Sequence, residues 1–131
     1  PADYLGGVVS RAAPGEIGLS GIAGGLGGHA PDESGGVGLR LAPPTDAPDT
    51  VRAVTMPGVV GHVGVTDHRR LAPGEPMVFD VADAVLSADG ERELEVSEAR
   101  VEMSAVDDGP RLVDFGRVFD AAARDGLFVS R

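Results

Sequence analysis

Two carboxylates beside an Asp-Gly turn are the residues whose type and spacing best suit chemistry. Asp89 and Glu91 flank Gly90, and an apolar run leads into this turn while alternating polar and apolar residues follow it. Asp-Gly between two such runs predicts a β-hairpin, because both residues tolerate positive φ. A hairpin tip would hold both carboxylates in a fixed and exposed position. A plain turn with solvated acids is the alternative interpretation.

The segment 16–29 is the second candidate, because glycine recurs there at close intervals. That density denies a helix or a strand a stable interior, so we expect a loop. Such a loop would let a ligand approach the backbone closely, although tight packing would require the same glycines. The segment is not a Walker A motif, because no Gly-Lys-Ser/Thr follows.

The three histidines do not predict a metal centre. His62 lies in a run of small residues, His68 lies beside two arginines, and neither has carboxylates at the spacing of zinc ligands. The chain has no cysteine, which excludes a thiolate site and a disulfide framework. For His29, His62 and His68 we therefore expect structural or solvated roles, and we predict no metal ligands.

The charge balance limits the partners. The 131 residues carry a formal net charge of −10, and all 11 basic residues are arginine. Such a surface repels nucleic acid and anionic membranes, so we predict neither as a partner. A halophilic source or a GC-rich genome would produce this composition. No run of eighteen apolar residues occurs, and no charged segment leads into an apolar block, so we expect a cytoplasmic protein.

Frequent turn signals between short apolar runs predict one domain over residues 1–131. Its fold class is mainly β, a sandwich-like multi-stranded β domain with one C-terminal helix. The apolar residues after the hairpin change from even to odd positions near residues 97–98, which predicts a bulge or a bend in the strand. Besides the hairpin, strands are expected at 4–9, 37–41, 51–56, 59–65 and 77–81, and loops are expected at 43–49 and 67–76. The helix is expected at 111–124, with its start at Pro110–Arg111. Residues 127–129 are then expected to return to the core.

Three segments in the same order resemble a known family. They are Ile-Gly-Leu-Ser-Gly-Ile-Ala-Gly at 17–24, Val-Leu-Ser-Ala-Asp-Gly-Glu-Arg-Glu at 85–93, and the pair 109–114 and 121–128. Together they resemble the C-terminal domain of the ATP-NAD kinase-like family, in the acetoin catabolism protein X group. That group is similar to NAD kinases and, more distantly, to diacylglycerol kinases.

The resemblance implies a β-rich half that supplies part of a nucleotide or acceptor site. It would make Asp89 and Glu91 the catalytic acids, with Asp89 as general base for an acceptor hydroxyl and Glu91 as its supporting or metal-side charge. NAD or ATP with Mg²⁺ would be the cofactors, and the cofactor-binding loop would be formed by Gly18, Ser20, Gly24 and Gly25. The family's Gly-Gly-Asp-Gly phosphate loop does not occur in this sequence. We therefore expect the chain to be inactive alone and to pair with a separate N-terminal kinase-like domain or to form a homo-oligomer. A non-catalytic β domain used in assembly is the alternative.

Overall fold

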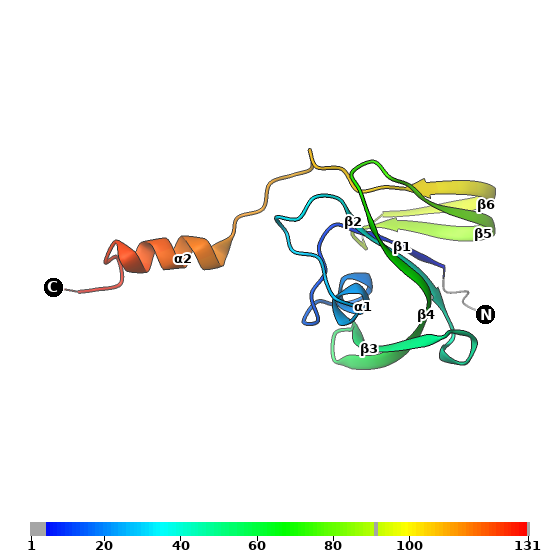
Figure 1. Ribbon diagram of the computed structural model, residues 1–131, viewed down its shortest axis with the longest axis horizontal. Coiled ribbons are helices and arrows are strands. Elements are labelled where there is room, and N and C mark those ends of the chain that lie inside the picture. Colours follow the sequence, from blue (N-terminus) through cyan, green and yellow to red (C-terminus); the bar gives the residue numbers. More distant parts are fainter. Residues whose placement is uncertain (1–4, 91, 131) are drawn as a thin grey trace.

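The computed structural model describes residues 5–90 and 92–130. The described part is mainly β with two sheets and a C-terminal helix, as the sequence predicts (Figure 1). The elements in chain order are β1 (Gly6–Val9), α1 (Leu19–Gly25), β2 (Gly36–Ala42), η1 (Pro44–Asp46), β3 (Asp49–Met56), β4 (Val59–Leu71), β5 (Met77–Ala88), β6 (Arg92–Met103) and α2 (Phe115–Arg124).

Four strands form one antiparallel sheet in the order β1-β2-β4-β3, and β5 and β6 form a separate two-stranded ribbon. Strand β4 is longer than predicted, because Asp67 pairs with Arg40 and Leu71 pairs with Gly36 of β2. The predicted loop at 67–76 was therefore wrong over its first five residues. Its charged side chains lie exposed on a paired strand.

Alternation along β2 separates two cores. Val37 and Leu39 are buried in the cluster that contains residues of α1, β3 and β4. Position 38 faces the ribbon, since a Cβ on Gly38 would lie 2.5 Å from the sulfur of Met77. The guanidinium of Arg40 lies 4.5 Å from the centroid of the Phe79 ring on β5. The sheet is thus packed on α1 by one face and on the ribbon by the other.

Helix α1 replaces the predicted loop in the glycine-rich segment. It lies inside the curve of β3 and β4 in Figure 1, and its Ile22 and Ala23 are almost fully buried. A Cβ on Gly21 would lie 2.3 Å from the carbonyl oxygen of Glu16, and one on Gly24 would lie 2.1 Å from the carbonyl carbon of Ala13. The glycines let the helix touch neighbouring backbone, and this packing outweighs their poor helix propensity.

The Asp-Gly hairpin is confirmed. Ala88 and Arg92 form the last ladder pair, and Asp89 and Gly90 have φ of 52° and 71°. The predicted irregularity near residues 97–98 is also confirmed, since Glu98 has a positive φ of 47°. The register of β5 and β6 is the same on both sides of Glu98. The irregularity is therefore a bend and not an inserted residue.

Helix α2 begins at Phe115 and not near residue 111. Asp114 is its N-cap, and the carboxylate accepts a hydrogen bond of 3.0 Å from the backbone N–H of Arg117. The predicted return of residues 127–129 to the core was wrong, because Leu127 and Phe128 are 74% and 65% exposed. In Figure 1, α2 lies clear of the two sheets.

Candidate functional site

The hairpin tip places the first predicted site residue in solvent. Asp89 is exposed at the end of the ribbon, and its left-handed backbone fixes the direction of its side chain. Glu91 lies outside the described residues. A carboxylate so exposed would need a second surface to enclose a reaction.

The predicted loop glycines lie on α1. Gly18 is the N-cap, with φ of 70°, and its N–H donates to the carbonyl oxygen of Val54 at 2.8 Å. Ser20 lies in the first turn, Gly24 is buried against residue 13, and Gly25 is exposed near Val51. Packing contacts account for Gly24, whereas Gly18 has open space around its Cβ position. The structure brings these four residues together on one helix.

A small apolar cavity connects α1 to the ribbon. Leu19, the residue between Gly18 and Ser20, lines a cavity of about 210 Å³ together with Leu86 and Ser87 of β5. Asp89 is not among the described residues that line it. The two predicted halves of the site therefore approach the same end of the ribbon without forming one pocket.

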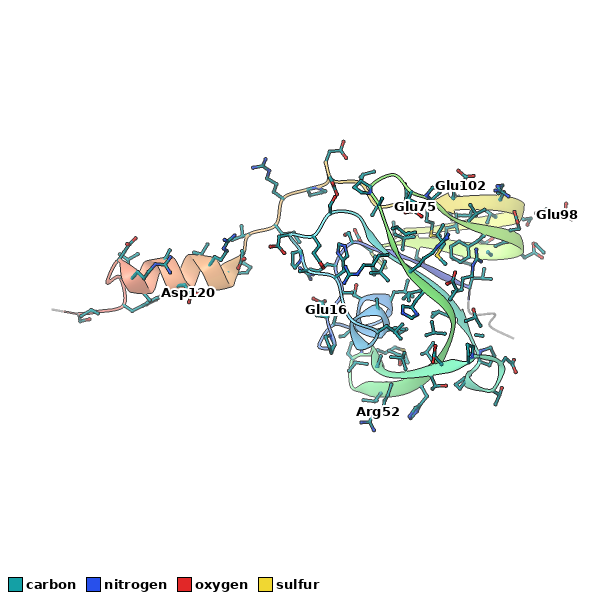
Figure 2. All side chains as sticks on the ribbon, viewed as in Figure 1. Glu16, Arg52, Glu75, Glu98, Glu102 and Asp120 are labelled. Carbon is teal, nitrogen blue, oxygen red and sulfur yellow. The ribbon has the colours of Figure 1, made fainter. Side chains whose placement is uncertain are left out.

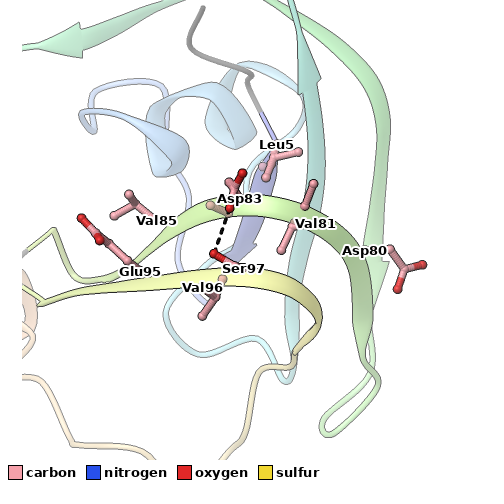
Figure 3. Close-up of a pocket in the computed structure, with 11 residues that line it drawn as sticks. Leu5, Asp80, Val81, Asp83, Val85, Glu95, Val96 and Ser97 are labelled. Atoms are coloured by element: carbon pink, nitrogen blue, oxygen red, sulfur yellow. Dashed lines mark hydrogen bonds between the residues drawn. The ribbon is translucent and has the colours of Figure 1, made fainter.

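A larger groove opens beside this cavity and has a volume of about 820 Å³. It runs between the start of β1 and the middle of the ribbon, as Figure 3 shows. Ser97 and Asp83 are directly opposed in the ladder, and the Ser97 hydroxyl donates to the Asp83 carboxylate at 2.8 Å. The remaining named walls are Leu5, Asp80, Val81, Val85, Glu95 and Val96, with glycine and alanine backbone between them.

The groove combines acidic and apolar character. Asp83 and Glu95 bring two carboxylates, and no Arg occurs among its described lining residues. The Asp80 carboxylate points away from the groove, as Figure 3 shows, and pairs with Arg100 at 3.6 Å. Carboxylates and a serine hydroxyl accept hydrogen bonds from hydroxyl and amine groups, and the carboxylates repel phosphate. The groove therefore suits a neutral or cationic ligand with hydroxyl groups. The sequence analysis missed Asp83 and Ser97.

A buried histidine organises the opposite end of the domain. His29 is 3% exposed, and its Nδ1 and Nε2 lie 2.9 Å and 3.2 Å from the carbonyl oxygens of Ser10 and Ser34. A neutral imidazole can donate to one of these oxygens at a time, and an imidazolium can donate to both. The predicted structural role of His29 is thus supported by its contacts with two loops, while His62 and His68 are exposed.

Two acids hold the same loops. The N–H of Ala30 donates to Glu33 at 2.6 Å, and this bond, followed by Arg70, lowers the pKa of Glu33. The Asp107 carboxylate accepts from the Ser34 hydroxyl at 2.6 Å and from the Gly35 N–H at 3.0 Å, and these two bonds lower the pKa of Asp107. Asp107 thereby anchors the chain where it leaves β6.

Asp107→Asn is expected to make the stability of the domain fall less steeply as pH is lowered. A carboxylate whose pKa is lowered by folding stabilises the protein above its unfolded pKa of about 4, and this stabilisation is lost as pH falls through the lower folded value. Urea midpoints measured from about pH 7 to about pH 2 should therefore fall more for the parent than for the variant. An equal fall of the urea midpoint in both proteins would contradict the role of Asp107 as an anchor.

Within residues 5–90 and 92–130, no group of three or more His, Cys, Asp or Glu side chains is placed to hold a metal ion. The two described helices are also too short or too polar to cross a membrane.

Comparisons with known proteins agree with the sequence resemblance at the level of the family. Residues 1–108 match the acetoin catabolism protein X C-terminal domain. The acetoin catabolism protein X of Cupriavidus necator is 38% identical over 86 residues, which are 66% of this chain and 24% of that protein. The chain thus spans about a quarter of the length of this relative, and no solved structure matches it. Because the family match covers most of the chain, the chain belongs to the acetoin catabolism protein X C-terminal domain family.

Proposed function

We propose that this chain is the acceptor-binding C-terminal domain of a kinase-like phosphotransferase. The nucleotide, with Mg²⁺, would bind mainly to another domain, because phosphoryl transfer needs a phosphate cradle and a bridging metal. The supporting observation is the groove around Asp83 and Ser97, which offers hydrogen-bond acceptors without an Arg among its described walls.

The chemistry of the groove favours hydroxyl recognition over phosphate recognition. Asp83 keeps one carboxylate oxygen besides the one bonded to Ser97, and Glu95 lies two ladder pairs nearer the tip. Such oxygens accept from a sugar hydroxyl, while Leu5 and Val85 offer apolar contact to the ring beside it. A ribose, as in NAD, combines these features, and its phosphates would have to lie outside the groove.

Asp89 remains our candidate for the general base. It lies on the same ribbon as the groove, at the tip, where a second domain could cover it. Glu91 would supply a supporting charge beside it. We keep four residues as the candidate cofactor-side surface, namely Gly18, Ser20, Gly24 and Gly25. Gly18 has open space around its Cβ position, which would let a ligand approach.

A non-catalytic assembly domain is the second candidate. The observation that favours it is the apolar face of α2, where Phe115 and Phe119 are 69% and 57% exposed. Apolar side chains exposed in a contiguous patch are typical of interaction sites.

A titration followed by NMR tests the groove. Adenosine should shift the backbone resonances of Leu5, Asp83 and Ser97, whereas inorganic phosphate should not. Ser97→Ala and Asp83→Asn should each weaken adenosine binding about tenfold, the loss expected for one hydrogen bond to a charged group. Glu102→Gln, on the outward-facing side of β6 (Figure 2), should leave it unchanged. Phosphate shifts at the groove, or no adenosine shift, would contradict the proposal.

A further inference from the structure

Helix α2 presents an apolar stripe to solvent. Phe115, Val118 and Phe119 are each more than half exposed, and they share one side of the helix with Ala122. Arg117, Asp120 and Arg124 occupy the other side by the same periodicity, and Figure 2 shows Asp120 on the helix. The stripe therefore has the pattern of a helix that packs against another apolar surface.

Local contacts fix both ends of α2. Asp114 caps the first turn. At the other end, Leu127 N–H donates to Ala122 O and Gly126 N–H donates to Ala123 O, with Gly126 at φ of 72°. This pair of bonds is a Schellman motif, which stops a helix at a defined residue. The chain then turns back, so that the ring of Phe128 lies 6.3 Å from that of Phe119 and widens the stripe.

The stripe is uneven along its length, and this unevenness identifies what fits it. The bulky residues Phe115, Val118 and Phe119 lie in the first half, and Ala122 is the stripe residue of the second half, flanked by Ala121 and Ala123. An antiparallel copy of the same helix would place the bulky half of each on the alanine half of the other, whereas a parallel copy would place Phe on Phe. Large residues against small ones give the closer packing.

Charge favours the same arrangement. Asp114 lies at the start of α2 and Arg124 lies in its last turn, so antiparallel copies bring each Asp114 near Arg124 of the other copy and oppose the two helix dipoles. The tail 111–131 carries four Arg and three acids, while residues 1–110 carry seven Arg and 18 acids. The tail is thus the part of the chain that can approach another copy with little repulsion.

We propose that α2 binds α2 of a second copy of this chain as an antiparallel, two-fold symmetric pair that sets Val118 opposite Ala122. The Asp107 anchor and the tail that follows hold α2 clear of the acidic sheets, as Figure 1 shows, so that both copies can engage. This pairing does not depend on the ligand groove.

Single-cysteine cross-linking tests the orientation, since the chain has no native cysteine. Val118→Cys and Ala122→Cys proteins are mixed and oxidised under mild conditions. The antiparallel pair predicts that the mixed 118–122 disulfide exceeds the share expected from random collision, because disulfides form between neighbouring Cα positions. Predominant 118–118 and 122–122 products would overturn the proposal in favour of parallel pairing.

Light scattering tests the association itself. The interface is small, so protein concentrations on the order of 100 µM are used. We expect dimer at this concentration, more of it in high salt because screening weakens repulsion between the acidic sheets, and only monomer for Phe119→Glu. Asp120→Asn, on the polar side of the helix, should dimerise like the parent. A monomeric parent, or a Phe119→Glu protein that still dimerises, would overturn the proposal.

Discussion

Asp89→Asn is expected to lower phosphotransfer by the assembled protein about 10²–10⁴-fold, the usual contribution of a general base. Stability should change little, because Asn tolerates the left-handed conformation of residue 89, at φ of 52°. The measurement is kcat with ATP, Mg²⁺ and NAD, after a relative's N-terminal domain has been supplied in trans or as a fusion. The urea midpoint of the variant chain provides the stability check.

Two other acids complete this experiment. Glu91→Gln should reduce kcat less than Asp89→Asn does, because it removes a supporting charge and not the base. Glu102→Gln, at an exposed position outside the groove, is the control and should leave kcat unchanged. Full activity of the Asp89→Asn protein would mean that the hairpin tip is only a turn.

Gly24→Ala is expected to destabilise the domain by about 2 kcal/mol. The new Cβ would lie 2.1 Å from the carbonyl carbon of Ala13 and 2.4 Å from the nitrogen of Pro14, so α1 must move away from backbone. Overpacking of this kind costs up to about 3 kcal/mol or more, and the better helix propensity of Ala offsets about 1 kcal/mol. Urea unfolding followed by circular dichroism measures the difference.

Gly15→Ala is the matched control. A Cβ at residue 15 meets no atom within 4 Å, and Gly15 is not among the residues with positive φ. Its urea midpoint should equal that of the parent or rise slightly. If the Gly24→Ala protein were equally stable, the contact between α1 and residues 13–14 would not require glycine.

Local signals explain which elements the sequence predicts correctly. Asp89-Gly90 predicts the hairpin because the conformations of both residues are properties of the dipeptide itself. The start of α2 was misplaced because Pro110 is a helix-start signal, but the Asp114 side chain provides the N-terminal cap. Helix α1 could not be predicted from propensity, since its glycines are explained only by backbone elsewhere in the chain.

Part of the candidate groove could have been predicted from the sequence. In a hairpin centred on Gly90, residues equally far from the turn are opposite each other, so Asp83 and Ser97 could have been paired by counting. Leu5 could not have been added, because nothing in its local sequence indicates that β1 lies beside the ribbon. The family was identified correctly, while its kinase-like chemistry rests on the proposal above.

The ribbon β5–β6 has a consequence for solubility as well as for binding. Each of its strands pairs with the other alone in the described sheets, so both outer edges expose backbone groups that another strand could join. Asp80, Arg100 and Glu102 line the outward-facing side and carry charge, and Glu98 bends one edge. Such charges and bends oppose edge-to-edge aggregation, so the acids of the ribbon also keep this long hairpin from pairing with other copies through its open edges.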